Sequence, residues 1–302
     1  MQKPPLIAVV GPTASGKSAL GVYLAQKING EIISADSRQV YTGLDIGTGK
    51  ITKKEMSGIP HHLLDVASPK KIFTVSDFVI QGKKAIAGMY TKQKIPIVVG
   101  GTGLYVDALL GRFVIPEVPP NPPLRSRLEK KSIGTLYTLL KQKDPRRAKT
   151  IESHNKRRII RALEIAATLG KNPLPQKDPN YRVLWIGIEI PEKTLRKRIH
   201  ERLLTRIKEG MIMEGKKLHE RGLSYKRMQE LGLEYQFLAL LLQGKITRQN
   251  FIENLERAIV RYTKSQMRWF TRNSDIVWVK NKSEALTYAK KFLASAQDKP
   301  TH

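Results

Sequence analysis

The chain has 302 residues and no cysteine, and its 54 Lys plus Arg outnumber 26 Asp plus Glu to give a formal net charge of +28. The length provides one large domain or two modest ones, and the missing cysteine excludes disulfides and Cys-based zinc sites. No apolar run of about 18 or more residues is present. We therefore expect a cytoplasmic protein with no membrane span, whose positive field attracts polyanions such as nucleic acid.

The first third of the chain alternates short apolar runs with segments of helical periodicity. The apolar runs lie at residues 6–10, 31–35 and 95–99, and each is followed by a glycine or polar turn. Residues 17–28 and 103–110 carry apolar side chains at helical spacing. Short apolar strands that alternate with helices predict an α/β fold whose parallel sheet is buried on both faces.

The pattern changes where proline becomes frequent. Residues 115–123 and 172–179 are rich in proline, which neither continues a helix nor fits a central strand. Between them, segments around 124–143 and 155–169 have helical character, and a strongly apolar strand resumes at 183–190. We therefore predict a mainly helical insertion domain at residues 116–182 within a core of residues 1–115 and 183–302, whose later part is largely helical with one further strand at 276–279.

A phosphate-binding loop follows the first predicted strand. Residues 11–18 read GPTASGKS and satisfy the P-loop pattern G-x-x-x-x-G-K-[ST]. In such a loop the glycines let backbone amides point inward, Lys17 adds a point charge, and the Ser18 hydroxyl is placed to hold Mg²⁺. We expect a P-loop NTPase-like core that binds the diphosphate of a nucleotide or of another compound. The predicted contacts are Gly11, Pro12, Thr13, Ala14, Ser15, Gly16, Lys17 and Ser18.

Two further loops follow the other predicted strands of this region. Asp36 comes directly after the second strand, and Gly100, Gly101 and Thr102 form a glycine turn after the third. Because α/β folds bind ligands at the carboxyl ends of their strands, we expect all three loops to converge on one crevice. Taken alone, Asp36 is open to two interpretations, a group that handles a metal-bound water or a proton, and a structural cap. The glycine turn alone is equally a tight strand-to-helix connection.

A basic helix is predicted near the C-terminus, at residues 251–272. At helical spacing, its apolar residues share one face and its basic residues line the other, without an acid among them. A solvated amphipathic face is the alternative, but the single sign of charge favours contact with phosphates. The basic stripe consists of Arg257, Arg261, Lys264, Arg268 and Arg272.

Two adjacent histidines, His61 and His62, precede the third apolar run. Neighbouring side chains do not easily converge on one metal in a helix or a strand, and no cysteine is available to complete a zinc site. We expect both histidines to be structural or hydrogen-bonding residues.

The order of these motifs resembles the tRNA dimethylallyltransferase family, also called tRNA isopentenyltransferases. The resemblance implies transfer of a dimethylallyl group from dimethylallyl diphosphate to N6 of adenosine 37, beside the anticodon of a tRNA, on a P-loop core with a helical insertion. The matching segments span most of the chain: GPTASGKS at 11–18, SADSRQVYTGLDIGT at 34–48, HHLLD at 61–65, GGTGLYVDALL at 100–110, RALEI at 161–165 and RYTKSQMRWFTR at 261–272.

The resemblance also implies roles for individual residues. Asp36 matches the base that takes the proton from the amine, and Thr102 matches a residue that hydrogen-bonds near that amine. Arg125 and Arg202 match arginines that reach the reaction centre or the diphosphate. Ser18 matches the Mg²⁺ ligand of the family's phosphate loop, so Mg²⁺ is the expected cofactor.

The partner implied by the resemblance is the anticodon stem-loop of tRNA, bound by a monomer. Many family members carry G-Y-K or G-Y-R near the start of the late helices, whereas this chain has Gly232, Leu233 and Glu234 there. We expect this difference to change the local tRNA contact without touching the chemistry. The residues that match tRNA contacts are Asp36, Ser37, Arg38, Gln39, Arg157, Arg158, Ile159, Ile160 and Arg161.

Three other functions share the same loop. A P-loop kinase acting on a nucleotide or RNA would need groups for a γ-phosphate, and no convincing second acid follows an apolar strand. Prenyl transfer to a free adenine nucleotide would use the same core, but the charge of +28 favours a polymeric acceptor. A non-catalytic RNA-binding protein with a vestigial loop is the third alternative.

Overall fold

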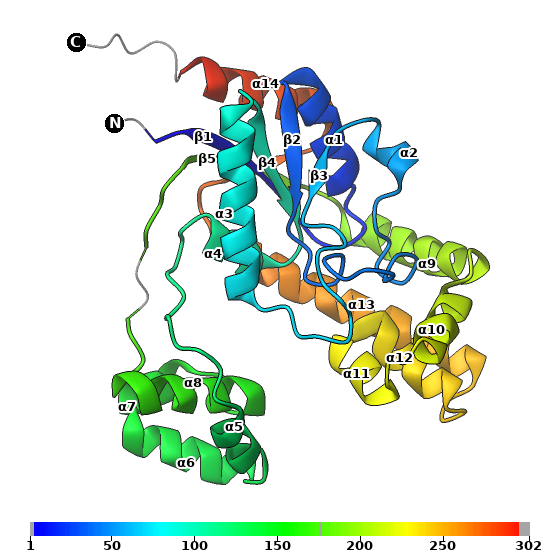
Figure 1. Ribbon diagram of the computed structural model, residues 1–302. Coiled ribbons are helices and arrows are strands. Elements are labelled where there is room, and N and C mark those ends of the chain that lie inside the picture. The colour runs from blue at the N-terminus through cyan, green and yellow to red at the C-terminus, as the bar shows by residue number, and fades with distance from the viewer. Residues whose placement is uncertain (1–2, 175–176, 296–302) are drawn as a thin grey trace. The chain divides into compact units, whose positions relative to one another are not determined.

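The computed structural model describes residues 3–174 and 177–295 and contains a six-stranded sheet whose paired strands are all parallel (Figure 1). The strand order is β3-β2-β4-β1-β5-β6, so the chain crosses over between neighbouring strands. The short strand β3, which contains the two histidines, was not predicted from the sequence. The strands are β1 (Pro5–Val10), β2 (Gly30–Ser34), β3 (His61–His62), β4 (Ile95–Gly100), β5 (Arg182–Ile188) and β6 (Ile276–Val279).

Strand β1 lies in the interior of the sheet, and its side chains alternate between two apolar layers. Ile7 and Val9 pack on one side, and Leu6 and Ala8 pack on the other, all of them buried. The apolar layer on the first side includes residues of α1 and α14, and that on the second side includes residues of α3 and α4. These helices are α1 (Lys17–Lys27), α3 (Val75–Thr91), α4 (Gly103–Leu109) and α14 (Lys282–Ala294). The sheet is therefore buried on both faces, as the sequence predicts.

The later part of the core is helical and has an apolar centre of its own. Tyr235 and Phe251 are among its fully buried side chains, together with Leu203 of the helix that follows β5. No helix within residues 3–174 and 177–295 is long and apolar enough to cross a membrane. The helices are α9 (Glu192–Lys208), α10 (Met211–Glu220), α11 (Tyr225–Leu231), α12 (Leu233–Leu242) and α13 (Arg248–Phe270), and the short α2 (Lys53–Met56) lies earlier in the chain.

Residues Arg112–Asp178 form a separate compact unit, whose core contains Leu136, Leu140, Ile159 and Leu163. The predicted division at residues 116 and 182 differs from its ends by a few residues, and residues 175–176 of the second proline-rich stretch lie outside the described residues. The helical segment expected at 124–143 is divided into two helices, because Ser132 caps the N-terminus of the second helix. The helices are α5 (Pro122–Glu129), α6 (Ile133–Lys143), α7 (Pro145–Thr150), which was not predicted, and α8 (Lys156–Leu169).

Candidate active site

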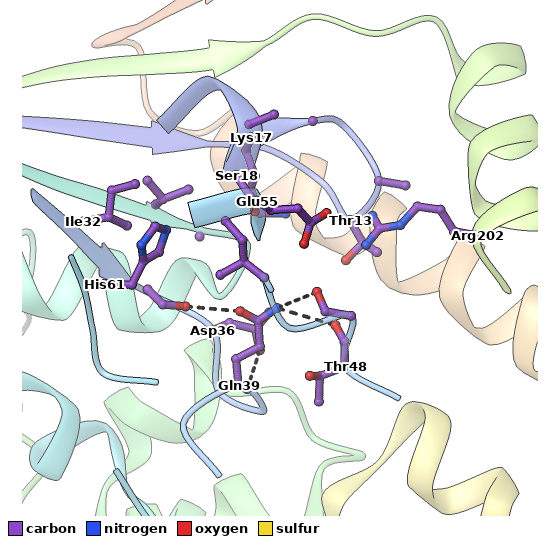
Figure 2. Close-up of a pocket in the computed structure, with 18 of the residues that line it drawn as sticks. Thr13, Lys17, Ser18, Ile32, Asp36, Gln39, Thr48, Glu55, His61 and Arg202 are labelled. Atoms are coloured by element: carbon purple, nitrogen blue, oxygen red, sulfur yellow. Dashed lines mark hydrogen bonds between the residues drawn. The ribbon is translucent and has the colours of Figure 1, made fainter. Parts of the chain in front are cut away.

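The loops after β1, β2 and β4 meet because these three strands are neighbours in the sheet. Together with α9 they surround a cavity of about 460 Å³ (Figure 2). The three loops thus converge at one edge, as the sequence predicts. The residues that line the cavity include Thr13, Lys17, Ser18, Ile32, Asp36, Gln39, Thr48, Gly49, Ile51, Glu55, His61, Val99, Gly100, Arg202 and Arg206.

The phosphate loop runs from the end of β1 to the start of α1. Gly16 has a φ of 96° at the N-cap of α1, a conformation that favours glycine. The loop amides do not all point into the cavity, which corrects the expectation from the motif. The Thr13 amide donates to Gln266 Oε1 at 2.8 Å, and the Ser15 amide donates to the Pro12 carbonyl at 3.3 Å.

Lys17 lines the cavity, and the pKa of its ammonium group is strongly shifted. Its Nζ donates to the Pro12 carbonyl at 3.2 Å. Burial lowers the pKa of Lys17 to about 8, with Asp36 opposing this shift and Arg202 adding to it. The negative charge of an anion bound in the cavity would oppose this shift, as Asp36 does.

Two arginines of α9 face the same space. Loss of water around the guanidinium and repulsion from Arg206 lower the pKa of Arg202 to about 10. Gly49 lets both arginines approach the cavity wall, since a Cβ at this residue would lie 1.9 Å from one Arg206 nitrogen and 2.9 Å from one Arg202 nitrogen. The structure thus places Arg202, which the resemblance identifies, beside Arg206, which sequence reasoning missed.

Glu234 is buried next to these arginines. Its carboxylate lies 3.4 Å from Arg206 Nη1, and both residues are 7% exposed. Burial raises the pKa of Glu234, although the Arg206 charge opposes the rise. The acid that replaces the family's basic residue therefore does not lie on the surface. It pairs with Arg206, which lines the cavity.

The position of Asp36 is compatible with both interpretations that the sequence left open, a structural cap and a group that handles a proton or a metal-bound water. Its Oδ1 accepts hydrogen bonds from the amides of Arg38 at 2.8 Å and Gln39 at 3.3 Å, which is the geometry of a structural turn. The same residue lines the cavity and lies on its inner wall in Figure 2. The turn therefore fixes the orientation of a carboxylate that borders the phosphate loop.

Thr102 lies on the loop after β4 and connects it by a hydrogen bond to the loop that contains Asp36. Its Oγ1 accepts from the Ser37 amide at 3.1 Å. Burial and the Asp36 charge raise the pKa of Tyr262 to about 12, while a hydrogen bond with the Thr102 side chain opposes the rise. Thr102 and Asp36 are thus held close together, with the buried phenol of Tyr262 beside them.

The cavity has a polar end and an apolar end. Figure 2 shows Ile32 and His61 on the opposite side of the cavity from Arg202. Ile51 and Val99 also line the wall. His61 Nδ1 lies 2.9 Å from the Ile59 carbonyl and His62 Nε2 lies 2.7 Å from Glu31 Oε2, so both histidines are hydrogen-bonding residues, as predicted.

The oxygen-bearing side chains near the phosphate loop fit a Mg²⁺ ion that binds together with a diphosphate. Ser18 and Asp36 border the same cavity as Lys17. Within the parts of the chain that the structure describes, no group of three or more His, Cys, Asp or Glu could hold a metal ion. A dedicated protein cage is therefore absent there, whereas Mg²⁺ bound mainly by phosphate oxygens and water needs only one or two protein ligands.

Arg125 and Arg161 belong to the compact unit Arg112–Asp178, where both pair with Glu164. Arg125 contacts both carboxylate oxygens of Glu164, at 2.8 and 2.7 Å, and the Asn121 amide donates to one of them at 2.6 Å. Burial alone would raise the pKa of Glu164, but the hydrogen bonds from Arg125, Asn121 and Arg161 lower it to about 2.

The segment expected to contact tRNA at 157–161 presents two kinds of side chain. Arg157 and Arg158 are exposed, whereas Ile159 and Ile160 are 0% and 3% exposed. The isoleucine side chains therefore pack the interior of the unit and hold the arginines of the first turn of α8 at its surface.

Helix α13 presents its basic stripe to solvent, because Arg257, Arg261, Lys264, Arg268 and Arg272 are all exposed. The surface is less uniform than the sequence indicates. Lys264 lies 3.4 Å from Glu192, and Glu253 and Glu256 share a groove with Arg257. Arg261 and Arg268 have no acidic partner among the described residues.

Several residues of the site were missed because nothing local marks them. Gln266 is buried on the inward face of α13, which also contains the polar Thr263, and Tyr262 is half-buried; all three lie within the matching segment 261–272. Glu214 of α10 accepts from the amides of Asp45, Ile46 and Gly47 at 3.0, 2.7 and 3.0 Å. It thereby supports the loop that contains Thr48 and Gly49.

Comparison with known proteins identifies the family to which this chain is similar. The sequence model of a family described as IPP transferase matches residues 39–273. A tRNA dimethylallyltransferase 2 of Treponema denticola is 42% identical over 272 residues, covering 88% of this chain and 91% of that protein. A tRNA dimethylallyltransferase of Halalkalibacterium halodurans is 38% identical over 287 residues, covering 91% of each.

Solved structures agree with the sequence matches. The full-length tRNA isopentenylpyrophosphate transferase of Bacillus halodurans has a TM-score of 0.72 at 36% identity, covering 97% of this chain and 96% of that one. A eukaryotic dimethylallyltransferase solved while acting on tRNA has a TM-score of 0.82 at 25% identity, covering 97% of this chain and 80% of that one.

Proposed function

The chain belongs to the IPP transferase family of tRNA dimethylallyltransferases, and from this premise we propose that its cavity transfers a dimethylallyl group from dimethylallyl diphosphate to tRNA. The observation that carries the proposal is the shared wall of the cavity. Lys17 of the phosphate loop and the carboxylate of Asp36 border one space. A group that binds an anionic leaving group thus lies beside a group that accepts a proton.

The acceptor atom is N6 of the adenosine beside the anticodon, a weak nucleophile because its lone pair is delocalised into the ring. As the N6–carbon bond forms and the carbon–oxygen bond to the diphosphate breaks, N6 must lose a proton. Asp36 takes that proton, since its carboxylate is fixed at the cavity wall by the amides of Arg38 and Gln39. Thr102, whose Oγ1 accepts from the amide of the adjacent residue Ser37, orients the amine.

The diphosphate leaves with its negative charge against the phosphate loop. Lys17 and Arg202 supply positive charge there, and Thr13 and Ser18 supply polar groups from the same wall. Mg²⁺, held by Ser18, would further neutralise the charge that develops on the departing oxygens. Arg206 faces the same cavity and adds a cation that the sequence comparison did not identify.

The tRNA contacts combine a flipped base with phosphate binding. The target adenosine must leave its stack to reach Asp36, and the segment from Ser37 to Gln39 is placed to receive the nucleotides around it. Arg157 and Arg158, which are exposed on the inserted unit, bind tRNA. The exposed arginines of α13, with Arg261 and Arg268 foremost, bind backbone phosphates.

The protein acts as a cytoplasmic monomer. The lack of cysteine and the RNA substrate fit a cytoplasmic location. Size-exclusion chromatography with light scattering should give the mass of one chain, 34.2 kDa. A mass of twice this value would contradict the monomer.

One incubation separates the proposed function from its alternatives. The protein is mixed with labelled dimethylallyl diphosphate, Mg²⁺ and unmodified tRNA, and in parallel with AMP or with γ-labelled ATP and RNA. Label in tRNA, located at N6 of the anticodon-adjacent adenosine after nuclease digestion, supports the proposal. Label in AMP alone, transfer of the γ-phosphate, or tRNA binding without any transfer would each overturn it.

A further inference from the structure

Gln266 connects the phosphate loop with the loop after β4 through its buried side-chain amide. The residue is 5% exposed and lies on the inward face of α13. Its Oε1 accepts from the Thr13 amide at 2.8 Å, and its Nε2 donates to the Gly101 carbonyl at 2.9 Å. The carboxamide, with one acceptor and one donor, satisfies both neighbours at once.

The two loops joined by Gln266 bind opposite ends of the reacting system. Thr13 belongs to the phosphate loop, which binds the leaving group. Gly101 directly precedes Thr102, whose Oγ1 accepts from the Ser37 amide beside Asp36. The distance between the base and the leaving group therefore depends on a contact that spans 253 residues of sequence.

The residues around Gln266 allow its amide to approach the backbone of Gly101 closely. A Cβ on Gly101 would lie 2.3 Å from Gln266 Nε2, so a larger residue at this place would displace the amide. One turn away on each side of the amide, Tyr262 interacts with Thr102, and Trp269 Nε1 donates to Asp107 Oδ2 at 2.8 Å. Helix α13 thus contacts the loop after β4 and the helix that follows it at several points.

We propose that Gln266 is a positioning residue of the transferase, which holds the phosphate loop and the Thr102 loop in the register that the transfer step requires. The inference rests on the proposed function. Because Gln266 acts on the alignment of bound groups rather than on their binding, its loss lowers kcat more than it raises KM.

Gln266→Leu removes both hydrogen bonds at similar volume, and Gly101→Ala displaces the amide sterically. Each should lower kcat for prenyl transfer to tRNA by about 10- to 100-fold and change KM for dimethylallyl diphosphate by less than about threefold. Thr263→Val is the matched control. Thr263 is 3% exposed on the same helix, and its hydroxyl donates to Val260 of that helix at 2.8 Å. This variant should keep the wild-type kcat.

Gln266→Glu provides a readout that general destabilisation does not give. An ionised carboxylate still accepts from Thr13 but repels the Gly101 carbonyl, whereas the protonated form donates as the amide does. Burial raises the pKa of such a carboxyl. The ratio of variant to wild-type kcat should therefore rise several-fold as the pH falls from about 8 to about 6.

The wild-type enzyme in the same assay separates the two proposals. If it transfers no prenyl group, the proposed function fails. If it does, and Gln266→Leu keeps kcat within twofold, or the Gln266→Glu ratio does not change with pH, the positioning role fails. Should Gln266→Leu not fold, the pH ratio of Gln266→Glu decides alone.

Discussion

Two buried glutamates in different regions of the molecule have pKa values shifted in opposite directions. Glu164 of the inserted unit is 1% exposed and Glu234 at the cavity is 7% exposed. Glu164 accepts from Arg125, Arg161 and the Asn121 amide, which outweigh burial and lower its pKa to about 2. Glu234 has Arg206 at 3.4 Å, and burial raises its pKa.

The difference shows how each region uses its positive charge. In the inserted unit, Arg125 and Arg161 both pair with Glu164 and stabilise the fold. At the cavity, burial and repulsion from neighbouring arginines lower the pKa of Lys17 to about 8 and that of Arg202 to about 10, so acidic groups compensate these cations only in part. The cavity therefore retains positive charge for an anionic substrate.

The largest effect is expected at Asp36, whose carboxylate is held at the cavity wall by the amides of Arg38 and Gln39. Asp36→Asn keeps the turn but removes the proton acceptor, so turnover should fall by about 10²- to 10⁴-fold. Binding of tRNA should stay close to wild type. Single-turnover transfer and a filter-binding assay measure the two quantities. A variant with near-normal turnover would exclude Asp36 as the base.

In the inserted unit, Glu164→Gln should cost about 3 kcal/mol of unfolding free energy, because it leaves two arginines without their acid. Since the folded pKa of Glu164 lies below the unfolded value, this stabilisation is present above about pH 4.5 and is lost as the pH falls toward about 2. Urea unfolding at several pH values measures it.

The matched control is Glu152→Gln in the same unit. Glu152 pairs with Arg158 at 3.0 Å, but both side chains are more than half exposed, at 57% and 58%. Its loss should cost less than about 1 kcal/mol. Equal losses in the two variants would contradict the special role of the Glu164 network.

A smaller effect is expected from the pH dependence of diphosphate binding. Lys17 binds an anion in its protonated form, which is lost in the free enzyme as the pH rises through about 8. The affinity should therefore weaken by up to about tenfold per pH unit above this value. Calorimetry with inorganic diphosphate measures it. Lys17→Met should bind weakly without this pH dependence, and the same slope in both proteins would rule out Lys17 as its source.

The smallest effect is expected on the outer face of α13. Replacing Arg261 and Arg268 together by Gln should weaken tRNA binding by about three- to tenfold and reduce the slope of log affinity against log salt by about 1 to 2. Lys216→Gln is the control, because Lys216 is exposed and lies 3.9 Å from Glu220. An unchanged salt slope in the double variant would remove α13 from the tRNA surface.

The sequence identified most elements that rest on local patterns. The apolar runs became β1, β2, β4, β5 and β6, because a short apolar run bounded by turn residues is visible without knowing the neighbours of the strand. It missed β3, which has two residues and exists only through pairing with β2. It also missed α7, a helix of six residues whose start depends on an Asp144 cap.

The sequence by itself determined where the phosphate loop, Asp36 and Thr102 occur, because each follows an apolar strand in a parallel sheet and must therefore lie at one edge. The tertiary structure alone decided that Gln266 joins two of these loops and that Glu234 faces Arg206. Such contacts depend on how helices far apart in the chain dock against the sheet. A single polar side chain on an apolar helix face does not say which backbone group it will meet.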